Sequence, residues 1–258
     1  MLYRVLICSM VLLGYHCFAL ADTREPPQQQ VNFAVQYYPP FTLENDANKG
    51  MLIELLEHFA SRSPYQVNYH GSAERHSTAE IENGTADIRM ESKKWYRGNK
   101  EMCWSSPLYH IKDVYVSHHS VTEIERDKLN QQVFLARFGY TYPDLEPQLL
   151  SGSLERKNYY SELDILSVLS HGRSAAAMFS VIGLPTLTWY QSQHPKLKES
   201  IKVHTVSDTA PLQLQFGHSS IAKQVCRDFN AFFAEFKKTA QFQQILLKYG
   251  LSIKGVGQ

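Results

Sequence analysis

The chain has 258 residues, of which 26 are lysine or arginine and 25 are aspartate or glutamate, so its formal net charge is +1. This even balance gives no support for a nucleic-acid or membrane-surface partner, which would favour a strongly basic patch. The length is sufficient for a sizeable buried core, in one large domain or two smaller ones.

The first 21 residues have the three parts of a secretory signal peptide. Arg4 supplies the positive start, Val5–Leu13 the apolar stretch, and Ala19–Ala21 a small-x-small cleavage site. The apolar stretch is shorter than the roughly 20 residues that a membrane span needs, although an uncleaved anchor is the alternative. We therefore expect an exported, soluble mature chain in which residues 22–30 form a solvated leader.

Strands and helices are predicted to alternate in the first half of the mature chain. Pro39 and Pro40 end the first strand, Gly50 opens a run of apolar residues at helical spacing, and Gly84 suits the left-handed position after a helix. The predicted strands are 31–35 and 67–69, and the predicted helices are 52–59 and 77–83.

The same alternation continues after residue 130, where Gly139 marks a turn and Pro143 lies near the start of a helix. The predicted strands are 132–137, 174–179, 201–206 and 212–216, and the predicted helices are 143–150, 161–170, 184–193, 221–238 and 241–249. Alternation of this kind indicates an α/β fold with largely parallel sheets.

The cysteines indicate a disulfide. Two of the four lie in the expected signal peptide, which leaves Cys103 and Cys226 as an even pair in an oxidising compartment. A bridge between them would close a loop on the order of 100 residues. Two buried free thiols are the alternative, because spacing alone cannot fix the connectivity.

The order and spacing of several short motifs resemble those of the type II periplasmic solute-binding proteins, specifically the family-3 proteins that serve polar amino acid uptake. The motifs are Pro40-Phe41, Gly50 with its helix, Gly84-x-x-Asp87, Trp104-Ser105-Ser106-Pro107, Gly172-Arg173 and the paired C-terminal helices. The resemblance implies a two-lobed fold with two mixed or parallel sheets, flanked by helices and joined by a two-strand hinge near Tyr115 and Leu214.

The same resemblance divides the chain between the lobes and suggests where a ligand lies. Lobe 1 would comprise residues 31–117 and 216–258, and lobe 2 would comprise residues 118–215. A ligand would be held between the lobes, which close around it. The C-terminal helices would return to lobe 1, within reach of Cys103.

The resemblance also implies roles for two residues. In amino-acid binders of this family, an arginine shortly before the Trp104–Pro107 segment grips the ligand carboxylate through its planar guanidinium, and Arg97 is the nearest candidate. Lys93 and Lys94 are alternatives, and each of the three could instead be a solvated surface charge. Ser180 lies nearest the place of the family's ammonium-binding aspartate, so a standard α-amino acid is a doubtful ligand.

Other candidate ligand-binding residues follow from the expected cleft. Tyr38 and Phe41, after the first strand, could wall an organic ligand, as could Trp95, although packing against neighbouring elements is the alternative. Arg137, Gly139 and Tyr140 join a strand to a helix, where free backbone N–H groups suit an anion, unless this is an ordinary turn. Arg75 could also face the cleft.

No catalytic or metal-binding signature is present in the sequence. Glu74 and Glu91 are the only acids that we nominate for acid–base chemistry, and the adjacent His118 and His119 should point to opposite faces of a strand. We expect no metal and no cofactor. The expected protein is a periplasmic, monomeric binder of a small polar, carboxylate-bearing solute, which it delivers to a membrane transporter or receptor. The alternatives are a dehydratase-like enzyme on the same fold and a ligand sensor.

Overall fold

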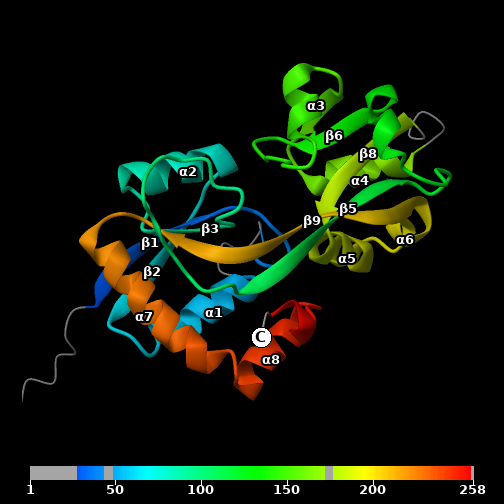
Figure 1. The fold of residues 1–258 in the computed structure, drawn as a ribbon. Helices are drawn as coiled ribbons and strands as arrows, with labels where there is room; N and C mark the ends of the chain where they lie inside the picture. The colour runs from blue at the N-terminus through cyan, green and yellow to red at the C-terminus, as the bar shows by residue number, and fades with distance from the viewer. Residues whose placement is uncertain (1–27, 44–48, 172–176, 257–258) are drawn as a thin grey trace, which may run out of the picture.

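The structure is a computed structural model, and it describes residues 28–43, 49–171 and 177–256. The expected signal peptide, most of the leader, the Gly172-Arg173 motif and the start of the strand predicted at 174–179 lie outside these residues. The predicted alternation of helices and strands is present along the described chain (Figure 1).

The elements of the first half are β1 Gln29–Val35, α1 Met51–Ala60, β2 Tyr65–Gly71, α2 Glu74–Asn83, β3 Ile88–Glu91, β4 Cys103–Trp104 and β5 Tyr109–His118. Those of the second half are η1 Arg126–Gln131, β6 Val133–Arg137, α3 Glu146–Ser151, β7 Glu155–Tyr159, α4 Glu162–Ser170, β8 Met178–Gly183, α5 Leu184–Gln193, α6 Lys196–Ser200, β9 Ile201–Phe216, α7 Ser220–Phe236, α8 Ala240–Lys248 and η3 Ile253–Gly255.

The strands form one sheet in the order β2-β1-β3-β9-β5-β8-β6-β7, with β4 also paired to β9, instead of the two separate sheets that we expected. The pairs on either side of β1 and of β6 are parallel, whereas β9 runs antiparallel to β3, β4 and β5. The strand β9 is what unites the sheet, because it pairs with β3 near Phe216 and with β5 over the rest of its length.

The two strands predicted at 201–206 and 212–216 are therefore a single strand, which corrects the sequence-based assignment. Thr209 and Pro211 stay in register with Lys112 and His110 of β5, so the chain remains extended where we expected a turn. The strands β5 and β9 run side by side through the middle of the molecule (Figure 1).

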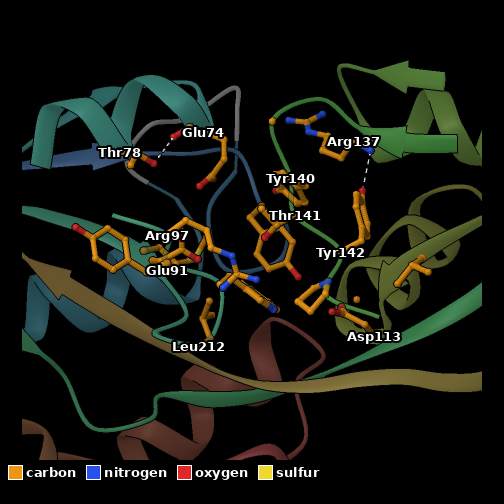
Figure 2. A pocket seen from close by; sticks show the side chains of 18 of the residues that line it. Glu74, Thr78, Glu91, Arg97, Asp113, Arg137, Tyr140, Thr141, Tyr142 and Leu212 are labelled. Carbon is orange, nitrogen blue, oxygen red and sulfur yellow. Dashed lines mark hydrogen bonds between the residues drawn. The ribbon is translucent and has the colours of Figure 1, made fainter. Parts of the chain in front are cut away.

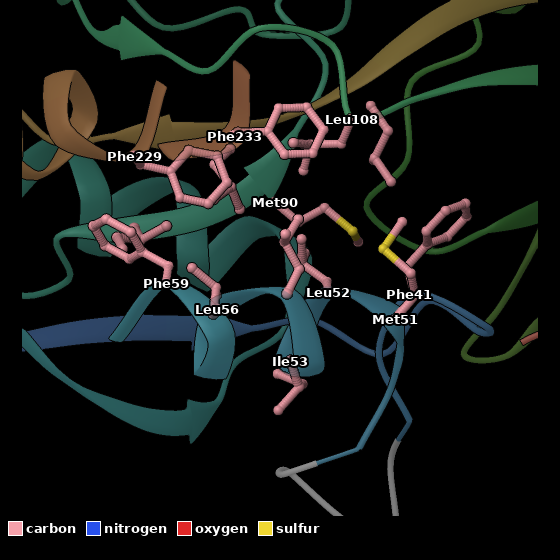
Figure 3. Close-up of a cluster of buried hydrophobic side chains, with 14 of the residues drawn as sticks. Phe41, Met51, Leu52, Ile53, Leu56, Phe59, Met90, Leu108, Phe229 and Phe233 are labelled. Atoms are coloured by element: carbon pink, nitrogen blue, oxygen red, sulfur yellow. The ribbon is translucent and has the colours of Figure 1, made fainter. Parts of the chain in front are cut away.

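The buried apolar side chains fall into separate clusters. The largest draws on both ends of the chain, and Figure 3 shows side chains of α1 such as Phe59 facing Phe229 and Phe233 of α7. Two smaller clusters are built only from residues 114–201. We call the elements around the large cluster the terminal part and those around the smaller clusters the central part. Both parts include portions of β5 and β9.

Helix termini are set by local hydrogen bonds, and this positions the side chains discussed below. Ser161 caps α4 by accepting from the backbone N–H of Asp164, which makes Glu162 the first residue of that helix. Gly84 ends α2 in the left-handed region with φ 84°, as predicted. Helix α2 begins at Glu74, three residues earlier than predicted, so Glu74, Arg75 and Thr78 all lie on it.

The predicted disulfide is present. Cys103 of β4 and Cys226 of α7 are joined by an S–S bond of 2.02 Å, with their Cα atoms 6.3 Å apart. The bridge ties the C-terminal helices to the sheet of the terminal part.

Candidate functional site

A cavity of about 340 Å³ lies between the terminal and central parts. Figure 2 shows Glu74 and Thr78 of α2 on one side, and on the other Arg137 at the end of β6 and Tyr142 in the loop that follows. Leu212 of β9 and Asp113 of β5 contribute to its lining from the paired central strands. The cavity therefore lies where the resemblance led us to expect a ligand.

Most of the predicted ligand-binding residues line this cavity, namely Tyr38, Arg75, Trp95, Arg97, Arg137, Gly139 and Tyr140. Phe41 and Ser180 do not. Phe41 is fully buried in the large apolar cluster, where its ring lies 5.7 Å from that of Tyr38 and 5.6 Å from that of Tyr109. Ser180 is also fully buried, and its hydroxyl donates to the carbonyl of Leu135 at 2.7 Å. Both side chains therefore serve packing between neighbouring elements.

Arg97 and Lys94, two of the proposed carboxylate clamps, already contact protein groups. Arg97 Nη2 lies 3.4 Å from a Glu146 carboxylate oxygen, and its Nη1 donates to the carbonyl of Lys94 at 3.2 Å. The ammonium of Lys94 pairs with Asp208. About half of the Arg97 side chain is exposed, so its ion pair is open to competition from solvent or a ligand.

Arg89 of β3 is a buried cation that sequence reasoning missed. Only 1% of it is exposed, and its partners come from α2, β3 and β9. Its Nε donates to Gln215 at 2.6 Å, its Nη1 to Thr78 at 2.7 Å and to Glu74 at 3.2 Å, and its Nη2 pairs with Glu91. The signal in the sequence is a charge inside a short apolar strand, between Ile88 and Met90.

Glu91, which we nominated for acid–base chemistry, lines the cavity beside Arg89. Burial, and then the nearby Glu74 carboxylate, raise the pKa of Glu91 to about 7, while Arg89 and the backbone N–H of Ser92 partly oppose that rise. The Ser92 N–H donates to the Glu91 carboxylate at 2.7 Å. The pKa of Glu91 therefore lies near neutrality although the guanidinium of Arg89 is in contact with its carboxylate.

Arg137 and Glu162 form a second buried pair, and it is incompletely satisfied. The Nη1 atom of Arg137, at the end of β6, lies 3.7 Å from a carboxylate oxygen of Glu162. Glu162 is only 4% exposed, yet neither of its oxygens accepts a hydrogen bond from another described residue, and Arg137 Nη1 donates none. Burial raises the pKa of Glu162, an effect that the charge of Arg137 only partly offsets.

Asp113 of β5 is another acid that lines the cavity, and sequence reasoning also missed it. It lies opposite Asp208 in the β5–β9 register and opposite Gly183 in the β5–β8 register. Burial and then the Asp208 carboxylate raise the pKa of Asp113 to about 7, Lys94 lowers it and Asp144 raises it slightly. The buried Oδ2 of Asp208 has no hydrogen-bond partner in the described chain.

The three tyrosines Tyr38, Tyr140 and Tyr142 complete the wall, and burial raises the pKa of each, so all three remain neutral hydrogen-bonding groups. The rings of Tyr38 and Tyr140 lie 6.3 Å apart, across the two parts of the molecule. The hydroxyl of Tyr142 accepts from the backbone N–H of Arg137 at 2.8 Å, which fixes the loop after β6 (Figure 2).

Within the described residues, no group of three or more histidine, cysteine, aspartate or glutamate side chains could hold a metal ion. The rings of His118 and His119 lie 4.2 Å apart, which corrects our expectation that they point to opposite faces. The reason is that β5 ends at His118 and His119 begins a turn. None of the helices in the described ranges is long and apolar enough to cross a membrane.

No protein-family model matches the sequence, and no curated protein matches it. Solved structures match across most of the chain. A substrate-binding protein of an ABC uptake transporter from Streptococcus pneumoniae, with bound histidine, has a TM-score of 0.71 at 17% identity, covering 85% of this chain and 92% of that one. An ancestral arginine-binding protein bound to arginine has a TM-score of 0.70 at 15% identity, covering 87% and 99%.

A third match is an ancestral amino acid-binding protein that is a precursor of cyclohexadienyl dehydratase, with a TM-score of 0.66 at 16% identity, covering 85% of this chain and 94% of that one. At these identities the likeness concerns the fold. The chain has the mixed α/β fold of the amino-acid-binding proteins of ABC transporters, which confirms the predicted resemblance at that level.

Proposed function

We propose that this chain is an exported binding protein that holds a small polar, carboxylate-bearing solute in the cavity and presents it to a membrane transporter or receptor. The observation that carries the proposal is the buried Arg137–Glu162 pair, which lines the cavity with unsatisfied hydrogen-bonding atoms on both members. Buried polar atoms without partners are costly, and a polar ligand in the cavity would supply the missing partners.

A carboxylate on the solute would be received by Arg137. Its side chain is only 15% exposed, and its Nη1 atom has a donor to spare. Arg97 at the exposed rim would stay paired with Glu146 and hold the two sides of the cavity together. This assignment differs from the one that the resemblance implies, because Arg97 is both more exposed and better satisfied than Arg137.

Binding would be coupled to a movement of two lobes, residues 31–117 with 216–258 and residues 118–215, about the paired strands β5 and β9. Contacts that would change in such a movement join the two sides. Thr186 donates to the carbonyl of Pro39 at 2.7 Å, the hydroxyls of Tyr190 and Tyr37 are 3.1 Å apart, and Arg97 pairs with Glu146. A membrane partner would recognise the closed arrangement. The protein would act in the periplasm as a monomer without a cofactor.

Binding can be tested with the chain that begins at residue 22. Native mass spectrometry would identify a solute that co-purifies, and thermal shift and calorimetry would measure binding of carboxylates, amines and sugars. We expect a ligand whose affinity falls by about tenfold or more in Arg137→Gln, because a charged hydrogen bond is worth about 1.5–3 kcal/mol. The matched control is Arg227→Gln, which changes an exposed arginine of α7 outside the cavity.

Two results would reject the proposal. One is the absence of any retained or added solute that shifts the melting temperature of the folded protein. The other is unchanged affinity in Arg137→Gln, with circular dichroism showing that both variants fold.

An enzyme of the dehydratase type is the second candidate, and the observation that favours it is the pKa of Glu91, raised to about 7 inside the cavity. A carboxyl with a pKa near neutrality can serve as a general acid or base. Against this role, its carboxylate is already engaged by Arg89 and by the N–H of Ser92. Recovery of the intact ligand after long incubation would support binding without catalysis. Conversion of the ligand by the unmodified protein, but not by Glu91→Gln, would establish catalysis.

A further inference from the structure

We propose that the cavity contains a subsite for an organic cation, a protonated or quaternary amine, formed by Asp113 of β5 and Glu162 of α4 together with Tyr38 and Tyr142. The inference rests on the proposed function, because it names the charge of the group that the solute would place there. It assigns the recognition of positive charge to elements other than the strand that carries Ser180.

The first argument is the balance of charge around the cavity. Its lining contains four arginines, Arg75, Arg89, Arg97 and Arg137, and seven acids, Glu74, Glu82, Glu91, Asp113, Asp144, Glu162 and Asp208. Arg89 is engaged by Glu74 and Glu91, and Arg97 is engaged by Glu146. Acids thus outnumber arginines in the lining, and two of the four arginines are committed to protein partners, which favours a ligand with positive charge.

The second argument is that Glu162 lacks a hydrogen-bond partner among the described residues, and that the lysine whose charge acts on Asp113 is paired with another acid. Glu162 is buried, and the cation that pairs with it in the described chain, Arg137, lies at 3.7 Å without a hydrogen bond from Nη1. Lys94, whose charge lowers the pKa of Asp113, gives its ion pair to Asp208. A buried carboxylate that is not hydrogen-bonded is costly, and an ammonium with up to three N–H donors would offset that cost.

The third argument is that the two acids line the same cavity as Tyr38 and Tyr142. The charges of both Asp113 and Glu162 raise the pKa of Tyr38 and that of Tyr142, so both rings lie within the field of both carboxylates. A methyl group built on Gly183 would fall 2.7 Å from the Tyr38 hydroxyl and 3.6 Å from Asp113 Oδ1. The hydroxyl and the carboxylate therefore converge on the same point beside β8.

Tyrosine rings beside carboxylates form a suitable site for an organic cation, because the electron-rich ring faces attract positive charge that the carboxylates neutralise. A compact metal ion needs several ligands close together, and no group of three or more histidine, cysteine, aspartate or glutamate side chains that could hold one occurs among the described residues. The alkyl groups of an amine, by contrast, would pack against the rings.

The subsite predicts a pH dependence near neutrality. Asp113 has a pKa of about 7, and the groups that face it are Asp208 of β9, Lys94 of the loop after β3, Asp144 before α3, and the tyrosines Tyr38 and Tyr142. A bound cation favours the ionised carboxylate, so binding should release a proton. Affinity for the amine should therefore rise as the pH increases from about 6 to about 8.

The test uses matched compounds on the same four-carbon skeleton: 1,4-diaminobutane, butyltrimethylammonium, 4-aminobutyrate, butyrate and succinate. Thermal shift and calorimetry on the chain from residue 22 would be repeated with two- and six-carbon homologues. We expect the compounds with a cationic nitrogen to bind more tightly than the pure carboxylates. Asp113→Asn and Glu162→Gln should each weaken that binding by about tenfold or more. The control, Glu199→Gln, changes an exposed acid of α6 outside the cavity and should have no effect.

The outcomes separate the two proposals. If pure carboxylates bind and the amines do not, or if both acid variants keep full affinity, the cation subsite is wrong while solute binding stands. If none of these compounds binds, the cation subsite fails, and solute binding is decided by the co-purified solute and the wider screen of carboxylates, amines and sugars. If a variant does not fold, the affinity of the unmodified protein for the amine that binds most tightly is compared at pH 6 and pH 8. Equal affinities at the two pH values would overturn the subsite.

Discussion

Arg89 illustrates at the scale of one residue how the cavity wall is maintained. Its side chain is fully buried, and it holds the Glu74 and Glu91 carboxylates at the junction of α2, β3 and β9. The planar guanidinium can serve several acceptors at once, which an ammonium could not do with the same geometry. Arg89 is therefore a structural cation, and its contacts leave it little capacity for a ligand.

We expect Arg89→Leu to lower the free energy of unfolding by about 3–5 kcal/mol at pH 8, because it leaves Glu91 as an uncompensated buried charge. The pKa of Glu91 is raised to about 7, so the acid is largely protonated at pH 5 in the folded state, and the loss should be smaller there. Urea unfolding followed by circular dichroism at both pH values measures this. Arg227→Leu, at an exposed position on α7, is the control. Equal losses at the two pH values would show that Glu91 is not the group left uncompensated.

The candidate site was predictable only where local sequence marked a loop or a turn. Gly139 and its neighbours Arg137 and Tyr140 were found because a strand–turn–helix signal is local. Asp113 and Glu162 were missed because each looks like an ordinary charge on a strand or at a helix start. What distinguishes them is their position in the lining of a cavity between distant elements, and that position depends on tertiary contacts.

At the scale of elements, the disulfide links two segments that the chain separates by 123 residues. It joins the two-residue strand β4 to α7, which packs against α1 (Figure 3). The strand alone has few backbone partners, so the bridge and the pairing with β9 together determine its position.

We expect the double variant Cys103→Ala with Cys226→Ala to be less stable by up to about 4–5 kcal/mol, because the bridge restricts a long loop in the unfolded chain. Chemical denaturation of the oxidised protein and of the double variant would measure the difference. Single alanine variants are unsuitable as controls, since each leaves a free thiol. A loss below about 1 kcal/mol would mean that packing of α7 on the sheet is sufficient by itself.

The sequence predicted helices better than strands, for a physical reason. The apolar stripe of α1 and the capping residues Ser219 and Thr239 of α7 and α8 act within one or two turns, so the local pattern is sufficient. Strand β9 differs, because Thr209 and Pro211 are extended only through pairing with β5. The union of two expected sheets into one follows from that same non-local pairing.

At the scale of the whole molecule, the cavity exists because two groups of elements approach each other across β5 and β9. The approach is close, since a methyl group on Gly139, whose φ is +88°, would lie 3.3 Å from the Cβ of Glu74 on α2. Beside this contact, the guanidinium of Arg75 lies 5.4 Å from the ring centre of Phe138, and Arg97 pairs with Glu146 at the rim. These contacts fit a closed arrangement that a ligand would stabilise.

The Arg97–Glu146 pair distinguishes between two roles for Arg97. If the pair only holds the two sides together, Arg97→Ala and Glu146→Ala should weaken ligand binding equally, by up to about fivefold, since an exposed pair is worth less than about 1 kcal/mol. If Arg97 grips a ligand carboxylate, as the resemblance implies, only Arg97→Ala should weaken binding. We expect the equal effect, because both side chains are about half exposed and already in contact.

The measurement is a double-variant cycle of ligand affinity by calorimetry, at low and at high salt. The combined variant should bind no more weakly than either single variant, and about 0.5 M salt should remove most of the difference from the unmodified protein. Unfolding free energies should stay within about 0.5 kcal/mol throughout, which separates an effect on closure from an effect on the fold. If Arg97→Ala weakens ligand binding and Glu146→Ala does not, Arg97 binds the ligand carboxylate. The anionic end of the solute would then lie at the rim instead of beside Arg137.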